Sequence, residues 1–522
     1  MTRLALASLA TLVAVSSGWL ACSSGSSSAG PGPSDASTEA EAASDGPATG
    51  FTLAIPCTDT IASIYGAPGP LPSDKGHIIK CAIDADIAKS DMQATATQGI
   101  STDDAPAKNI GYLGKPFTSG AHVYRILYRT ERGDPNKSPG YSSAKVLIPD
   151  HPRAAGPLPL LVASHATAGQ AGRCAPSEAS KTVSAPWAIN DIDTYLFPLV
   201  GLGLPVIMPD LAGYSNFGAT GNPVSGYAQY LDVGKSTLDG ARALAKMFPG
   251  AFSGKVALVG HSQGGHSSLS ALAIQPTYAP EVDIAAVATL SPLWLSQRSW
   301  GALLAVASSY PLATSPTANA VSIWYHYSHG ELLDGPGHGL DPFAPAKHAL
   351  IKSFMGTDCD AQSWDGSYGS EYPDLQAGAT TALDLFDPAF VNSVALPAAI
   401  GGACTGDPLC AKWTKRYVED RPHLSTKVPI LIEYGSADDT IPPGRMACVT
   451  DRLKQDKVAY SFCLRPGVGH EGILRQAGSD VVDWIASKAM GEPAPPACAE
   501  TDANLTNDAG VPIPCSTPPP ND

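Results

Sequence analysis

The stretch that decides the fold is Lys255-Val-Ala-Leu-Val-Gly260-His-Ser262-Gln263-Gly264. Its first five residues include a short apolar run, which is typical of a buried β-strand. The pattern G-x-S-x-G follows at once, and small residues then continue as a helix-forming segment. A serine between a strand and a helix must lie in a tight turn, where a Cβ on either glycine would collide with a neighbouring element. The sequence therefore predicts that Ser262 is a nucleophile at the end of a strand.

Other apolar runs predict the remainder of a sheet. They are continuous rather than alternating, which is typical of strands buried on both faces of a parallel sheet. Helical patterns lie between them, most clearly over 230–247, with further segments at 269–274 and 481–485. This alternation predicts a doubly wound, mostly parallel α/β sheet with helices on both faces. The expected strands are 158–163, 204–208, 256–259, 284–290, 428–432 and 458–463, preceded by an antiparallel pair at 122–129 and 144–148.

The spacing of the strands predicts an insertion. About 130 residues separate the strand ending at Leu290 from the strand starting at Val428, far more than an ordinary connection needs. We expect a mainly helical cap subdomain there, over one end of the sheet. The predicted organisation is a signal peptide at 1–22, a disordered tether at 23–50, an N-terminal extension at 51–115, a core at 116–292 and 426–490, the cap at 293–425, and a Pro-rich tail at 491–522.

The N-terminus is typical of an export signal. Arg3 precedes a short apolar stretch, and Trp19-Leu-Ala-Cys22 is similar to the motif that precedes a lipidated cysteine. The Ser/Ala/Gly-rich segment that follows has too few large apolar residues to fold. We therefore expect a lipid on Cys22 that anchors the protein to the cell envelope, with the outer membrane as the favoured location. Ordinary signal cleavage and release is the alternative.

Charge and cysteine content exclude some classes of protein. The chain has 33 basic and 48 acidic residues, a net charge of −15, which argues against a nucleic-acid partner because such binding needs a basic surface. Ten of the 11 cysteines remain if Cys22 carries lipid, which predicts up to five disulfides in an exported chain. Local pairs Cys404–Cys410 and Cys448–Cys463 are the guesses that sequence allows. No cysteine spacing is typical of zinc, so we expect no metal, and the chemistry requires no cofactor.

A serine nucleophile needs a base, and the base needs an orienting carboxylate. In folds built around such a turn the chain order is serine, acid, histidine. The loop after the strand 428–432 contains Asp438 and Asp439, and the position three residues after Gly435 favours Asp438. His470, on a Gly-flanked loop 32 residues after Asp438, is the expected base. The rivals His165, His261 and His266 do not have this chain order.

Two backbone N–H groups should bind the oxyanion that forms during acyl transfer. Gln263 follows the nucleophile and should supply the first. The loop after the strand 158–163 should supply the second, from Thr167, whose hydroxyl could also contribute, or from Ala166. Asp210 is interpreted as a structural turn residue. The histidines of the insertion, His326, His329 and His338, have no spacing that indicates a metal site.

The chain resembles the secretory lipases of the lipase A type, a branch of the α/β-hydrolases, over roughly 115–490. The residues that carry this resemblance are His165-Ala-Thr-Ala-Gly169, Cys174-Ala-Pro-Ser177, Gly203-Leu-Pro-Val-Ile-Met-Pro-Asp210-Leu-Ala-Gly213, the turn around Ser262, and the loops of Asp438 and His470. The resemblance implies an α/β-hydrolase fold with a cap that holds the acyl chain, and ester or lipid substrates. The sequence departs from the family in reading His-Ala-Thr where His-Gly-Thr is common, in its many cysteines and in its N-terminal anchor.

Three hypotheses follow. The first is a secreted serine carboxylic-ester hydrolase that uses Ser262, His470 and Asp438 and forms an acyl-enzyme. The second is a peptidase or acyltransferase with the same three residues, although no propeller-like repeat precedes the core. The third is a surface-binding lipoprotein on a catalytically dead scaffold. The sequence does not indicate an oligomeric state, an acyl-chain length or a choice between lipase and short-chain esterase.

Overall fold

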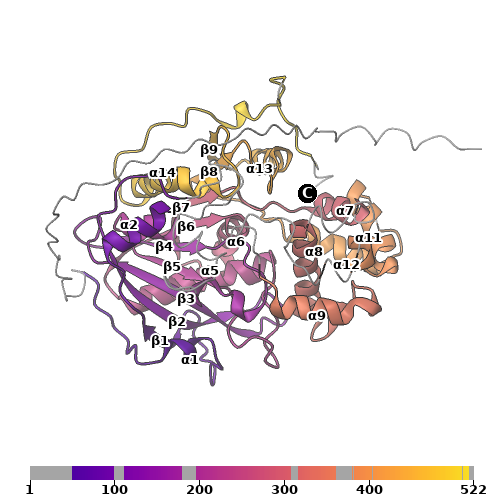
Figure 1. Ribbon diagram of the computed structural model, residues 1–522, viewed down its shortest axis with the longest axis horizontal. Coiled ribbons are helices and arrows are strands. Elements are labelled where there is room, and N and C mark those ends of the chain that lie inside the picture. Colours follow the sequence, from indigo (N-terminus) through magenta and orange to yellow (C-terminus); the bar gives the residue numbers. More distant parts are fainter. Residues whose placement is uncertain are drawn as a thin grey trace, which may run out of the picture. The chain divides into compact units, whose positions relative to one another are not determined.

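Nine strands form one mixed sheet in the computed structural model, which describes residues 50–98, 111–178, 195–306, 316–359, 375, 379, 381–402, 404–507 and 509–516 (Figure 1). The spatial order is β1-β2-β3-β5-β4-β6-β7-β8-β9. The first three strands are antiparallel to their neighbours, and β5, β4 and β6 to β9 run parallel. The strands are β1 Ile78–Ile83, β2 Ala121–Glu131, β3 Pro139–Pro149, β4 Leu158–Ser164, β5 Val206–Pro209, β6 Phe252–His261, β7 Asp283–Leu290, β8 Ile430–Gly435 and β9 Tyr460–Arg465.

The predicted sheet is therefore confirmed, including the antiparallel pair formed by β2 and β3. The sequence pattern missed β1, which belongs to the expected N-terminal extension and pairs with β2 at the edge of the sheet. Its residues show no alternation of apolar and polar side chains because an edge strand is only partly buried. The disulfide Cys57–Cys81 fastens this strand to the segment before it.

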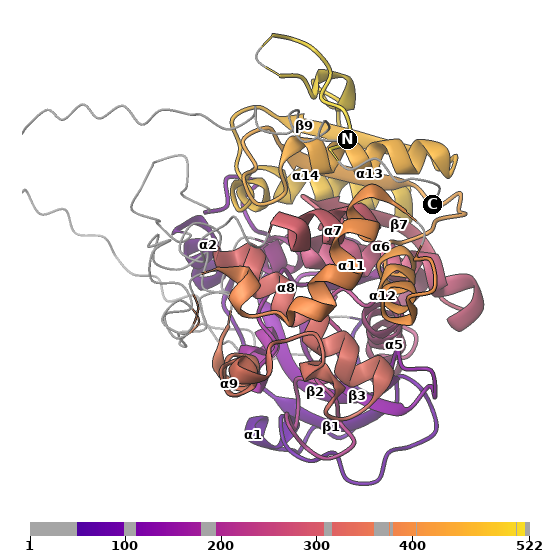
Figure 2. The same ribbon diagram turned by 90° about the vertical axis from the view of Figure 1, so that its right-hand side faces the viewer.

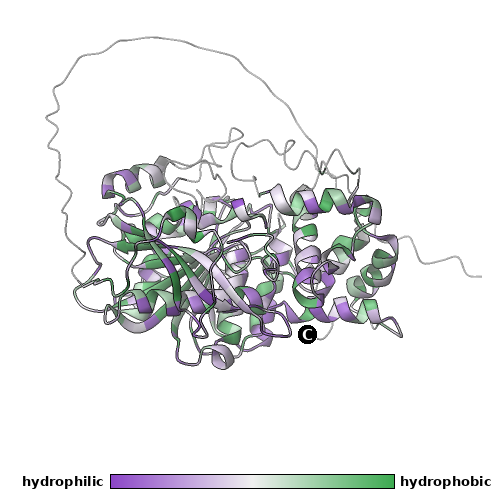
Figure 3. Ribbon diagram, turned by 90° about the horizontal axis from the view of Figure 1, so that it is seen from below, coloured by the Kyte–Doolittle hydropathy of each residue, from purple (hydrophilic) through white to green (hydrophobic). Residues whose placement is uncertain are grey.

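Helices cover both faces of the sheet, and each face has its own apolar core. Successive residues of β4 alternate between the two cores: Leu160 and Val162 face one, Leu161 and Ala163 the other. This is the two-residue period of a strand buried on both sides. Figure 3, in which the ribbon is coloured by residue hydropathy, shows hydrophobic residues (green) along the strands. One face carries α2 Lys89–Gln98, α4 Phe197–Gly201 and α14 Gly472–Ala489; the other carries α5 Tyr230–Met247, α6 Gln263–Tyr278 and α13 Pro443–Gln455, and the short α1 Ile61–Ile64 contacts β1.

The segment between β7 and β8 is helical in the part that the structure describes. Its helices gather beside the sheet, on the right in Figure 1 and toward the viewer in Figure 2. Trp300, Trp324 and Trp413 are fully buried among them, so this part has an apolar core of its own that continues into the core of the sheet. The doubly wound α/β class with a helical insertion is confirmed. The helices are α7 Gln297–Val306, α8 Pro316–His329, α9 His348–Thr357, α11 Pro388–Ile400 and α12 Pro408–Glu419.

Five disulfides join the ten cysteines from Cys57 to Cys515, as the even count predicts. The local pair Cys404–Cys410 is confirmed. The pair Cys448–Cys463 was wrong: Cys448 bonds to Cys515 and Cys463 to Cys498. The physical reason is the sheet itself, because Cys448 lies in the core on one face and Cys463 in the core on the other. Both partners come from the C-terminal tail, which is fastened once to the helix that contains Cys448 and once to β9.

The remaining disulfide, Cys174–Cys359, joins the core to the insertion across 185 residues. Among the described helices, none combines the length and the apolar character that crossing a membrane would require. Cys22, the expected signal peptide and nearly all of the expected tether lie outside the described residues.

Candidate active site

Ser262 lies in the turn between β6 and α6, which is the position that the sequence predicts. Its backbone has φ 51° and ψ −117°, a conformation that costs a non-glycine residue about 1–3 kcal/mol and that is common at functional sites. The carbonyl of Ser262 accepts hydrogen bonds from the N–H groups of Gly265 and Leu293. These contacts hold the turn in its strained form, and α6 begins at the next residue, Gln263.

The two glycines of the motif are required by close approaches of the backbone. A Cβ on Gly260 would lie 2.0 Å from the carbonyl oxygen of Gly264, and a Cβ on Gly264 would lie 1.8 Å from the carbonyl oxygen of Ser164. Neither contact is compatible with a side chain. The second approach also brings the first turn of α6 against the end of β4. The loop expected to supply an oxyanion donor therefore lies beside the turn of Ser262.

Asp438 and His470 meet at the same edge of the sheet. Their loops follow β8 and β9, which are parallel neighbours, and a Cβ on Gly435 would lie 2.1 Å from the carbonyl oxygen of Val468. The glycine lets the two loops touch. His470 Nδ1 lies 2.9 Å from Asp438 Oδ2, while Asp439 is exposed to solvent. Of the two aspartates, the one favoured by spacing is the one that contacts His470.

Asp438 is held as a carboxylate. Burial by itself would raise its pKa, but the charge of His470, the hydrogen bond to that ring and the N–H of Ile441 outweigh burial and lower the pKa below its usual value. The N–H groups of Thr440 and Ile441 both donate to Oδ1, at 3.1 and 2.7 Å. A charged carboxylate on Nδ1 fixes the ring of His470, so Nε2 is the nitrogen that can exchange a proton with a nucleophile.

The rival histidines are engaged elsewhere. His165 directs both ring nitrogens at carbonyl oxygens, those of Ala166 and Asp210. His266 donates to the carbonyl of Asp420 at 2.7 Å, and burial lowers its pKa. His261 donates from Nε2 to the carbonyl of His470 at 3.2 Å. The hydrogen bond made by His261 ties the loop of His470 to the residue directly before Ser262.

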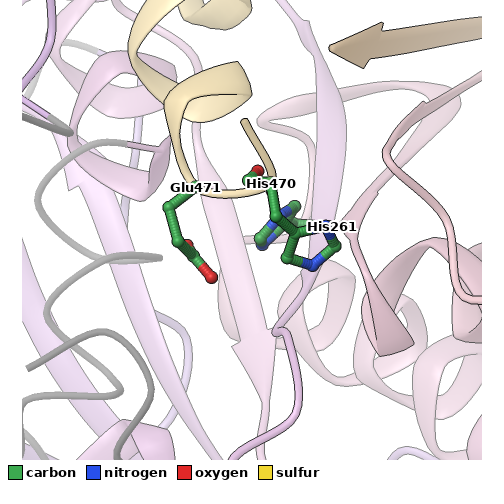
Figure 4. A group of neighbouring side chains, drawn as sticks. All are labelled: His261, His470 and Glu471. Atoms are coloured by element: carbon green, nitrogen blue, oxygen red, sulfur yellow. The ribbon is translucent and has the colours of Figure 1, made fainter. Parts of the chain in front are cut away.

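Glu471 is the one charged residue next to the expected base in sequence, and Figure 4 shows its side chain beside His261 and His470. The ligand-type atoms of these three residues lie within 4.8 Å of one another. The histidine rings are 4.7 Å apart between centroids. A cation placed there would compete for the ring that Asp438 orients, so we interpret the group as the surroundings of a base. The histidines His326, His329 and His338 of the insertion bond to protein groups.

The loop after β4 is fixed by contacts that sequence reasoning missed. Thr167 Oγ1 lies 2.8 Å from the hydroxyl oxygen of Tyr227. Tyr214 donates to the carbonyl of Gly169, and Gly169 forms a β-bridge with Cys359 of the insertion. None of these partners lies in a motif, because each reaches the loop from a distant part of the chain. Gln263 is the first residue of α6, where backbone N–H groups have no partner within the helix.

Asp210 has the structural role that the sequence indicates. It is fully buried, and it accepts hydrogen bonds from the N–H and hydroxyl of Ser177 and from the hydroxyl of Ser143. Burial raises its pKa despite these bonds. The Cys-Ala-Pro-Ser segment is thus anchored to the end of β5, which fixes the far end of the loop that carries Thr167.

Comparisons with known proteins agree with this geometry. A family model described as "Secretory lipase" matches residues 183–293, which include Ser262. Three solved structures are similar to the chain: a hydrolase of Legionella pneumophila (18% identity, TM-score 0.57, 80% of this chain and 100% of that chain), lipase A of Candida antarctica (18%, 0.55, 87% and 88%), and the rice cell wall degrading esterase LipA of Xanthomonas oryzae (16%, 0.54, 80% and 99%). No curated protein matches the sequence.

At these identities the solved structures bear on the fold, while the family model bears on the class of protein. The expected α/β-hydrolase fold is confirmed over most of the chain. The resemblance to the secretory lipases, expected from the motifs, is confirmed by the family model. The match to the secretory lipase model, in the segment that contains Ser262, therefore indicates a carboxylic ester hydrolase of the lipase and esterase class.

Proposed function

We propose that this protein is an exported serine esterase or lipase that works through Ser262, His470 and Asp438. The observation that carries the proposal is the 2.9 Å contact between His470 Nδ1 and Asp438 Oδ2, at the sheet edge where the strained turn of Ser262 lies. A nucleophile, a base and an orienting carboxylate in this chain order are what acyl transfer through an acyl-enzyme requires.

The reaction would run in two halves. His470 Nε2 takes the proton of Ser262 as Oγ attacks the ester carbonyl, and the same proton passes to the leaving alcohol when the tetrahedral intermediate collapses. Asp438 stabilises the imidazolium without taking its proton. Water, deprotonated by His470, then attacks the acyl-enzyme and releases the acid. The N–H groups of Thr167 and Gln263 bind the oxyanion in both halves.

The substrate is an ester whose acyl part lies under the cap. Trp324 of α8 packs against Tyr227, with 5.9 Å between ring centroids, and Tyr227 contacts Thr167. The insertion therefore reaches the loop proposed for the oxyanion, which supports a substrate site between cap and sheet. The solved lipase and esterase with this fold act on esters as their names state.

Hydrolysis of p-nitrophenyl esters from acetate to palmitate tests the proposal. Ser262→Ala should lower kcat by about five orders of magnitude, because the nucleophile is lost while the fold is kept. Ser253→Ala is the matched control: it removes an exposed hydroxyl from the opposite end of the same strand and should leave the rate unchanged. The chain-length profile of the wild type separates a lipase from a short-chain esterase.

Labelling with an organophosphonate covers the other outcomes. A mass increase on the peptide that contains Ser262 is expected, and none in the Ser262→Ala variant. Turnover of amides without turnover of esters would indicate a peptidase instead. A folded wild type that neither turns over esters nor takes up the phosphonate would contradict the proposal and indicate a dead scaffold.

We also propose that residues 1–22 direct export and that Cys22 carries a lipid, with 23–50 as a flexible tether to the cell envelope. Five disulfides in the described residues support an oxidising compartment. Mass spectrometry of the mature N-terminus tests this: a diacylated Cys22 peptide is expected, and an unmodified N-terminus beyond Cys22 would indicate plain secretion instead.

A further inference from the structure

We propose that Tyr227 is the positioning residue of the oxyanion hole: its hydroxyl donates to Thr167 Oγ1 and thereby directs the threonine's own proton at the substrate oxygen. The inference rests on the proposed function and assigns part of its mechanism to a residue outside every motif. The two hydroxyl oxygens are 2.8 Å apart, a normal distance for such a bond.

The direction of the hydrogen bond follows from the chemistry of the two hydroxyls. A phenol is the more acidic group and the better donor, whereas an aliphatic hydroxyl oxygen is the better acceptor. Tyr227 is fully buried, while Thr167 is half-buried at the edge that faces the insertion. With the phenol donating, Thr167 keeps its own proton for a second hydrogen bond. A developing alkoxide beside its N–H would accept a hydrogen bond from that hydroxyl, in addition to those from the backbone donors.

Tyr227 is held rigidly enough to do this. Its N–H donates to Ser328 Oγ of α8 at 3.0 Å, and its ring lies against Trp324. The loop that carries it is built on a buried ion pair: Arg132 bonds to both oxygens of Asp232 and to the carbonyls of the residues before Tyr227, Pro223 and Val224. A hydrogen-bond donor fixed in this way loses no further conformational freedom when the transition state forms.

The placement also explains why the loop after β4 is contacted from two sides. Tyr227 contacts Thr167, and Cys359 of the insertion forms a bridge with Gly169 and a disulfide with Cys174 farther along the same segment.

A double-mutant cycle on the purified, disulfide-intact protein tests the proposal, with Tyr227→Phe, Thr167→Val and the double variant. Tyr227→Phe should lower kcat about tenfold and change KM less than threefold, because only the transition state accepts the hydrogen bond from the Thr167 hydroxyl. Thr167→Val, which keeps the backbone N–H, should lower kcat by about 10- to 100-fold. The double variant should equal Thr167→Val, since Tyr227 acts only through Thr167.

The control is Tyr128→Phe, which removes a buried phenol that donates to the carbonyl of Ser236 away from the site. It should leave kcat unchanged while lowering the thermal stability about as much as Tyr227→Phe does. A boronic acid inhibitor supplies a readout that a purely structural role would not move: its tetrahedral adduct carries the oxyanion, so its Ki should rise by the factor by which kcat/KM falls in Tyr227→Phe.

Two results would overturn the inference. One is a kcat for Tyr227→Phe within twofold of that of Tyr128→Phe. The other is a double variant whose loss is the product of the single losses, which would mean that Tyr227 acts independently of Thr167. Failure of the proposed function is a separate result. In that case either Ser262→Ala would retain turnover or the wild type would show none, whatever happens at Tyr227.

Discussion

The sheet core and the helical insertion each contain a buried aspartate–histidine pair, and the two pairs differ in which ring nitrogen faces the carboxylate. In the core, His470 Nδ1 lies 2.9 Å from Asp438. In the insertion, His329 Nε2 lies 2.7 Å from Asp420, but His329 Nδ1 also lies 2.7 Å from the carbonyl of Tyr325. The carbonyl can only accept, so His329 Nδ1 donates to it, and both ring nitrogens of His329 are occupied by protein groups. In our proposal, the same two residue types serve chemistry in the core and structure in the insertion.

Asp420 shows what the structural pair does. Its carboxylate also accepts from the hydroxyl of Tyr325 at 2.6 Å and from the N–H of Tyr230 at the start of α5. Its carbonyl accepts from His266, on the helix that follows Ser262. Asp420 thus joins α8 of the insertion to two helices of the core. The pair in the insertion therefore helps to fix the insertion against the core. A buried charge can do so only when all of it is paired.

The largest expected contrast between the pairs is in activity. Asp438→Asn should lower kcat by about 10⁴-fold, because His470 loses the carboxylate that orients its ring. Asp420→Asn should change kcat less than tenfold, yet lower the free energy of unfolding by about 3 kcal/mol, since His329 and Tyr325 would lose a buried charged partner. Ester kinetics and denaturant unfolding of both variants measure the contrast. Equal losses of kcat in the two variants would remove the distinction.

The disulfides provide a second contrast, between a link that joins the regions and a link within the insertion. Replacing Cys174 and Cys359 by serine frees a chain segment of 185 residues, which should cost about 5 kcal/mol by loop entropy. Replacing Cys404 and Cys410, only six residues apart, should cost about 2 kcal/mol. Only the first variant should also lose activity, because Gly169 of the Thr167 loop bridges to Cys359. Guanidinium unfolding and ester kinetics test both parts. A larger loss of unfolding free energy in the Cys404 and Cys410 variant than in the Cys174 and Cys359 variant would contradict the prediction.

The smallest expected effect, taken per pH unit, is the pH dependence that the insertion contributes to the free energy of unfolding. Burial lowers the pKa of His326 to about 3, below the value of about 6.5 for an unfolded chain. Between these values the unfolded state binds the extra proton, so stability falls as the pH falls from about 6.5 toward 3, by about 1.4 kcal/mol per pH unit. His326→Gln should remove this slope. His151→Gln, on an exposed ring, is the control and should leave it. Unfolding between pH 6 and pH 4 checks the difference.

Much of the core could be predicted because its signals are local. The apolar strands, the helix over 230–247 and the turn of Ser262 each follow from residues adjacent in sequence. The order of the strands' loops along the chain also predicted that Asp438 and His470 come to one edge, because parallel strands end their loops at the same side. The edge strand β1 could not be predicted, because partial burial leaves no regular pattern.

The sequence by itself determined the α/β class, the turn that places Ser262 between a strand and a helix, the presence of a helical insertion, and an even set of disulfide-forming cysteines. Only the tertiary structure decided that Cys448 and Cys463 face opposite sides of the sheet, that Asp420 and His329 pair inside the insertion, and that Tyr227 contacts Thr167. The physical reason is the range of the interactions. Strand and helix patterns record the burial of neighbouring residues. These contacts, in contrast, join residues 35 to 91 positions apart, and the partners are selected only when the packed layers bring them together.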